Sequence, residues 1–131
     1  MSLDFYLEGP SEQIIETHQC PECAHRHEHT RQTRQTYFDR NITHNLGAMA
    51  QAAHIYQALW HPDEAKPPMV YARELIPPLS VGLDALRADP GYFKQFNAKN
   101  GWGTYEHFVP FVEACLTACI AHPDALVRTS T

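Results

Sequence analysis

The stretch LDFYLE (residues 3–8) decides the fold class of this chain. Apolar Leu3, Phe5 and Leu7 alternate with polar or amphipathic neighbours, and a period of two is typical of a strand with one buried face. A Gly-Pro-Ser turn signal follows, and QIIETH (13–18) has the composition of a returning strand. The sequence therefore predicts a β-hairpin at the N-terminus.

Helical spacing replaces this pattern after Asn41. Apolar residues recur three or four positions apart from Leu46 to Trp60, which predicts one helix that ends before Pro62. Leucines at positions 75–86 predict a second helix. Because two prolines interrupt it, we expect a short helical turn and then a main helix that starts at Pro77.

Two more helices and a strand are predicted towards the C-terminus. Asp89 precedes a proline, a combination that typically starts a helix. Thr104 is expected to cap the longest helix, whose apolar stripe holds Cys115 and Cys119 as small core residues. Residues 125–128 can then form the last strand.

These elements predict an α+β fold with a small antiparallel sheet, made of the N-terminal hairpin plus the C-terminal strand. Three to four helices pack against it, and it carries a Cys/His metal knuckle. A length of 131 residues and a hydrophobic content of 44% suit one core, so we expect residues 1–131 to form a single domain. Within that domain, residues 18–40 form a metal-binding, basic, His-rich excursion.

The composition limits where the chain can work. No stretch reaches the roughly 18–20 apolar residues of a membrane span, and residues 1–10 lack the basic start and apolar run of a signal peptide. We therefore expect a cytoplasmic protein without a membrane partner, whose cysteines are metal ligands or core residues rather than disulfides. The net charge of −5 argues against generic nucleic-acid binding.

The strongest chemical signal is a Cys-x-x-Cys motif followed by histidines. Cys20 and Cys23 can hold one cation from a single turn, and zinc favours thiolate together with imidazole in a set of four ligands. The next histidines alternate along the chain and can supply a third ligand: His25, His27 and His29. A fourth ligand has to come from elsewhere, and His18 and His44 are the candidates.

Several readings of this segment remain open. Cys20 and Cys23 can form an exposed dithiol or a tight loop without an ion, and the His-rich run can be a solvated basic loop. If zinc binds, a structural ion is favoured over a catalytic one, because a catalytic zinc needs an open position and a general base. Only Glu22 and Glu28 are nearby carboxylates in the sequence.

Two motifs of the chain look familiar. NITHNLG (41–47) and NGWGTYE (100–106), with LWHP (59–62) between them, resemble a small group of bacterial and phage proteins without an assigned activity. Strand DFYLE (4–8) and the residues 118–123 extend the resemblance over most of the chain. It implies a shared fold. It also implies that the Cys-containing insertion varies in the group, which favours an accessory or structural role for its metal.

Both motifs have a structural and a functional interpretation. Asn and Thr residues are the types that cap helices, and the two glycines of NGWGTYE allow a tight reversal that inserts Trp102 into the core. Alternatively, His44, Asn45, Trp102 and Tyr105 line one pocket. An indole wall with an amide and an imidazole suits a small polar or aromatic ligand.

The leading functional prediction is a non-enzymatic, zinc-stabilised module that binds a protein or a ligand, with a phage origin implied by the resemblance. No Gly-x-Ser-x-Gly, His-Glu-x-x-His or Gly-rich phosphate loop is present in the sequence. The first alternative is a metal-dependent hydrolase with His44 and a histidine of segment 25–29 at an open site. The second is nucleic-acid binding through the arginines of segment 25–40, which are Arg26, Arg31, Arg34 and Arg40.

Overall fold

The computed structural model describes residues 2–9, 12–19, 26–33 and 35–131 of the chain, with the backbone alone described for residues 12–19 and 26–33. In chain order, the described elements are β1 (Ser2–Glu8), β2 (Glu12–Gln19), β3 (Arg26–Thr33), β4 (Thr36–Thr43), η1 (His44–Leu46), α1 (Gly47–Ala52), α2 (Tyr56–Trp60), η2 (Pro62–Glu64), α3 (Ala72–Ala88), α4 (Pro90–Lys94), α5 (Tyr105–Ala121) and β5 (Leu126–Ser130). The predicted α+β class and the predicted C-terminal strand are confirmed.

Strand β1 is the centre of a three-stranded antiparallel sheet with the order β4-β1-β5. Its alternating pattern buries Leu3, Phe5 and Leu7 completely, as the sequence predicts. Opposite these residues, β4 contributes Ile42 and Phe38 to the same face of the sheet. The helices cover this face and close the core.

The predicted N-terminal hairpin is wrong. Strand β1 does not pair with β2, because β2 pairs with β3 in a separate two-stranded sheet. The Gly9 amide donates to the Gln35 carbonyl oxygen at 2.7 Å. This bond pairs the residue that follows β1 with the residue that precedes β4. The physical reason lies in residues 12–19, which place Ile14 beside Ile15 and lack the alternation that a half-buried sheet requires.

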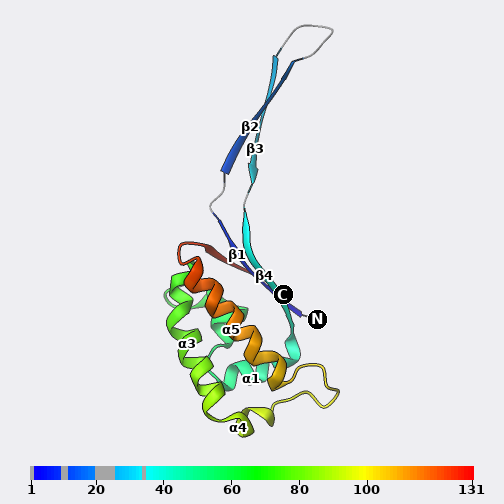
Figure 1. Cartoon of the computed structure of the whole chain (residues 1–131), viewed down its shortest axis with the longest axis vertical. Helices are drawn as coiled ribbons and strands as arrows, with labels where there is room; N and C mark the ends of the chain where they lie inside the picture. The colour runs from blue at the N-terminus through cyan, green and yellow to red at the C-terminus, as the bar shows by residue number, and fades with distance from the viewer. Residues whose placement is uncertain (1, 10–11, 20–25, 34) are drawn as a thin grey trace.

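The β2–β3 ribbon projects away from the body of the molecule (Figure 1). It is a sheet of two strands, and the helices lie at the opposite end of the structure. The predicted excursion over residues 18–40 therefore corresponds to parts of this ribbon and to β4. The connection between β2 and β3, residues 20–25, lies outside the described residues.

The predicted helix from Leu46 to Trp60 is divided into η1, α1 and α2. The chain breaks at His54, which has a φ of 60°, a left-handed conformation that ends α1. This break turns Ile55 into the core, where its Cγ2 methyl lies against Gly82 of α3. Burial of Ile55 between helices therefore overrides the helical periodicity.

Helix α3 runs without interruption through Pro77 and Pro78, so the predicted helix start at Pro77 is wrong. The two prolines remove only two amide donors near the N-terminal end of a 17-residue helix. Packing compensates for that loss, because its apolar face is buried against α5 and the helices around it: Ala72, Leu75, Leu79, Gly82, Leu83 and Leu86.

The remaining helix predictions fare better. Asp89 caps α4 by accepting from the Tyr92 amide at 3.2 Å, as expected. Thr104 occupies the N-cap position of α5, although its hydroxyl contacts the His107 ring (3.1 Å) instead of a backbone amide. None of the helices in the described part of the chain is both long and apolar enough to cross a membrane.

Cys115 and Cys119 lie on the buried stripe of α5, which confirms their prediction as core residues. Burial raises the pKa of the Cys119 thiol to about 12. Burial also raises the pKa of the Cys115 thiol well above its ordinary value, with the nearby Cys119 adding to the effect. Both thiols therefore stay protonated at neutral pH and are poor nucleophiles.

Candidate functional site

The ribbon register brings together residues that are predicted to bind zinc. His18 of β2 lies opposite His27 of β3, and Glu16 lies opposite His29. Directly opposed residues of an antiparallel pair have Cα atoms about 4.5–5.5 Å apart and share a face with residues two positions along. Cys20, Cys23 and His25 belong to the connection outside the described residues.

His44 lies at a different place in the molecule. It follows β4, and the Nε1–H of buried Trp60 donates to its Nδ1 at 2.8 Å. Between His29 and His44 lie the rest of β3 and all of β4, which together make on the order of 40 Å of extended strand. The structure therefore does not bring His44 to the ribbon histidines. Among residues 2–9 and 35–131, no group of three or more His, Cys, Asp or Glu side chains could hold a metal ion.

A second candidate site lies where the C-terminal end of β4 meets the turn before α5. A hollow of about 660 Å³ is lined there by hydroxyl, amide and indole groups of Ser2, Asn41, Thr43, Asn45, Asn100 and Trp102. Of the four residues predicted to line one pocket, the structure brings Asn45 and Trp102 together at this hollow. The Asn45 side-chain amide donates to the Trp102 carbonyl oxygen at 2.8 Å.

The expectation that Trp102 inserts into the core is wrong, because its side chain is 72% exposed. The turn positions the indole on the outside through two glycines in the positive-φ region, Gly101 at 78° and Gly103 at 114°. Gly103 lies so close to Asn45 and Thr43 that the backbone, rather than the indole, fills the space beside η1.

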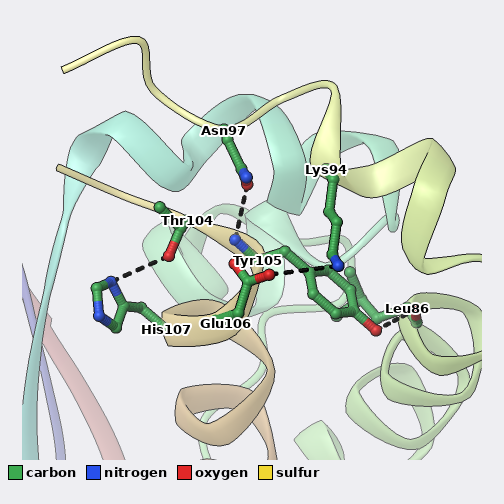
Figure 2. A network of polar contacts seen from close by, with 7 residues as sticks. All are labelled: Leu86, Lys94, Asn97, Thr104, Tyr105, Glu106 and His107. Carbon is green, nitrogen blue, oxygen red and sulfur yellow. Dashed lines mark hydrogen bonds and ion pairs between the residues drawn. The ribbon is translucent and has the colours of Figure 1, made fainter. Parts of the chain in front are cut away.

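Tyr105 has a structural position instead (Figure 2). Its hydroxyl donates to the Leu86 carbonyl oxygen at 2.8 Å, and its amide donates to Asn97 Oδ1 at 2.7 Å. These bonds tie the start of α5 to the end of α3 and to the loop after α4. Tyr105 and His44 do not line the Asn45–Trp102 hollow.

Four lining residues were not predicted as site residues: Ser2, Asn41, Thr43 and Asn100. Asn41 opens the NITHNLG motif, and Asn100 opens the NGWGTYE motif, so each motif carries an asparagine at its border. More than 50 positions separate them in the sequence, and only the fold brings them together.

The Glu106 carboxyl in the first turn of α5 should have a lowered pKa. Glu106 accepts a backbone hydrogen bond there, which is the main cause that lowers its pKa from the ordinary value of 4.5, and Lys94 lowers it further from 3.4 Å (Figure 2). Because the folded-state pKa is lowered, the stability from Glu106 is present above the unfolded pKa and is lost as pH falls through the folded one. A carboxyl-detected NMR titration should therefore place the Glu106 pKa below 4.5. In Lys94→Met it should rise only partly, and a wild-type value at or above 4.5 would contradict the helix-terminus account.

Comparison with known proteins adds no relative. No protein-family profile, curated protein or solved structure matches the chain, so its resemblance to bacterial and phage proteins stays a prediction.

Proposed function

We propose that this chain is a non-enzymatic binding module, in which zinc stabilises the β2–β3 ribbon and the ribbon engages a protein partner. The observation that carries the proposal is the ribbon register, which sets His18 opposite His27 two strand positions from Glu16 and His29. This pairing joins the chain segments on either side of the Cys20–Cys23 motif.

The register favours one ligand set among the alternatives. His18 and His27 form the pair of opposed histidines in the ribbon, one position before its end at the connection that contains Cys20 and Cys23. Two thiolates and two imidazoles satisfy the tetrahedral preference of zinc, and a closed set of four leaves no position for a catalytic water. The proposal therefore assigns zinc a structural role, with His25 and His29 as the alternative imidazole ligands.

A bound metal would also stabilise the β2–β3 ribbon. A two-stranded sheet alone is marginally stable in water, and β2 and β3 pair only with each other in the described part of the chain. A zinc ion at the connection would close the ribbon and contribute its binding free energy to folding. The edges of such a ribbon present unpaired backbone groups, which a partner protein can extend with a strand of its own.

Zinc content tests this proposal. Untagged protein, purified without nickel or zinc resins, should carry about one zinc per chain by mass spectrometry, and Cys20→Ser/Cys23→Ser should carry almost none. His18→Ala/His27→Ala should lose most of it. The matched control is His61→Ala/His107→Ala, which removes two histidines of the body and should leave the zinc unchanged. Equal, near-zero zinc in the wild type and the cysteine variant would refute the metal site.

The same proteins test the two alternative functions. An open metal site that takes up water as an additional ligand, seen in an absorption spectrum of the cobalt-substituted protein as a coordination number above four, would favour a hydrolase. Oligonucleotide binding that weakens steeply with salt would favour the arginine-rich segment as a nucleic-acid surface.

A further inference from the structure

The Asn45–Trp102 hollow has a second unusual property besides its lining. The Trp102 side chain is exposed, so its burial contributes little to the stability of the fold. The backbone of Trp102 is nevertheless held by hydrogen bonds on both sides. Its amide donates to Asn100 Oδ1 at 2.9 Å, and its carbonyl oxygen accepts from the Asn45 side chain at 2.8 Å. The structure thus fixes the backbone that carries an indole which it does not bury.

The turn that carries Trp102 is also packed tightly against the corner between β4 and η1. A Cβ at Gly103 would lie 3.1 Å from both Asn45 Cβ and Thr43 Cγ2. In addition, the Ala98 amide donates to the Gly103 carbonyl oxygen at 2.9 Å. The indole is therefore presented in a preorganised position, which lowers the entropy that a ligand would have to overcome.

Trp102 borders two hollows. Besides the hollow of about 660 Å³, a second one of about 300 Å³ lies along Ile42, Leu46, Gly101 and His107. Among the described residues, no Asp, Glu, Lys or Arg lines either hollow. A phosphate or carboxylate ligand would find no Lys or Arg in this described lining, and a cationic ligand would find no carboxylate in it.

Neutral hydrogen-bonding groups remain available in the larger hollow. In the described part of the chain, no partner occupies Asn45 Oδ1, Asn41 Oδ1 or Asn100 Nδ2. The Asn41 side-chain nitrogen is already held by Ser2 and Asp4, which fixes the direction of its free oxygen. Together with the hydroxyls of Ser2 and Thr43, these atoms can both donate and accept.

From this arrangement we infer that the Asn45–Trp102 hollow binds a neutral carbohydrate, with one sugar ring packed on the Trp102 indole. The C–H face of a pyranose suits the negative π-face of an aromatic ring, and its hydroxyls suit amides that both donate and accept. A nucleobase fits less well, because Trp102 is the one aromatic residue in the described lining of the larger hollow and no second ring closes a stacking slot. This inference is independent of the zinc ribbon.

The two tryptophans of the chain provide the test. Two indole N–H signals are expected in a ¹H–¹⁵N spectrum, and Trp102→Phe assigns them. Trp60, whose Nε1–H bonds to His44 in the core, reports on the integrity of the fold. The probes are maltotriose, cellotriose, mannotriose and triacetylchitotriose, with adenosine and uridine as the competing ligand class.

At least one trisaccharide should shift the Trp102 signal saturably with a Kd on the order of 1 mM, while the Trp60 signal stays in place. Trp102→Ala should abolish the accompanying shifts of the Asn41 and Asn45 backbone amides. The matched control is Tyr92→Ala, which removes an exposed aromatic ring on α4 and should leave the Kd within about twofold.

Three results would each overturn the inference. One is that no trisaccharide shifts the Trp102 signal at concentrations about tenfold above that Kd. Another is that a nucleoside binds more tightly than every trisaccharide. The last is that Trp102→Ala, with the Trp60 signal intact, binds the sugar as the wild type does. Loss of zinc in the cysteine variant leaves this test unaffected, so the two proposals fail separately.

Discussion

Gly82→Ala should destabilise the protein by about 2 kcal/mol, although alanine is the better helix former. Gly82 lies inside α3, where the intrinsic preference for alanine over glycine is about 1 kcal/mol. A Cβ there would overlap the Ile55 Cγ2 methyl and lie 3.3 Å from the Ala53 carbonyl oxygen. Because Ile55 is fully buried, neither it nor the backbone before it can withdraw without disturbing the core.

Urea unfolding measures this effect, and the chain offers a matched control. Gly91 lies in α4 with its nearest heavy atom 4.0 Å from the position of an added Cβ, so Gly91→Ala should be neutral or slightly stabilising. A double-mutant cycle with Ile55→Ala should show that Gly82→Ala costs less once the methyl is gone. If Gly82→Ala were as stable as the wild type, the close contact between α3 and the α1–α2 break would be disproved.

The contact between Gly82 and Ile55 also explains why part of the fold was not predictable. The alternation of residues 3–8 is a local pattern, and it correctly predicted β1 and its buried face. The helical spacing from Leu46 to Trp60 was equally regular, but the break at His54 depends on a glycine almost 30 positions later. No pattern within the segment contains that information.

Strand pairing failed for a similar reason. The turn signal at residues 9–11 correctly marked the end of β1, but a turn signal does not specify whether the next strand returns or continues. The partners of β1 are residues 36–43 and 126–130. These segments contribute Ile42, Phe38 and Val127 to the core, and that burial decides the pairing. Pairing between distant segments is therefore decided by the shared core and not by the connecting loop.

The two candidate sites were also predicted only in part from the sequence. Motif spacing identified Asn45 and Trp102 as members of one site, and the structure places them in direct contact. It also assigned Trp102 to the core in the structural interpretation, because sequence alone does not show that positive-φ glycines turn the indole outward. For the zinc site, spacing along the chain left His18 and His44 as the two candidates for a fourth ligand, and the register adds that His18 lies opposite His27.

Gly103→Ala should cost about 3 kcal/mol and displace the turn that carries Trp102. Two effects add at this position. A φ of 114° is strained for any residue with a Cβ, at about 1–3 kcal/mol, and the new methyl would lie 3.1 Å from Asn45 and Thr43. The turn can relieve the crowding only by moving away from η1, which stretches the hydrogen bond from Asn45 to the Trp102 carbonyl oxygen.

Gly101→Ala separates these two effects. Gly101 also has a positive φ, 78°, but no heavy atom lies within 4 Å of an added Cβ, so its substitution should cost only the backbone strain of about 1–2 kcal/mol. Urea unfolding gives the change in the free energy of unfolding for each variant. The indole N–H signal shows whether the surroundings of Trp102 have changed. Gly103→Ala should shift the Trp102 signal and the Asn45 side-chain amide signals, whereas Gly101→Ala should leave the Asn45 amide where it is. Because Trp60 reports the core separately, an unchanged Trp102 signal in folded Gly103→Ala would mean that the turn is not held by η1, and the preorganised indole would lose its physical basis.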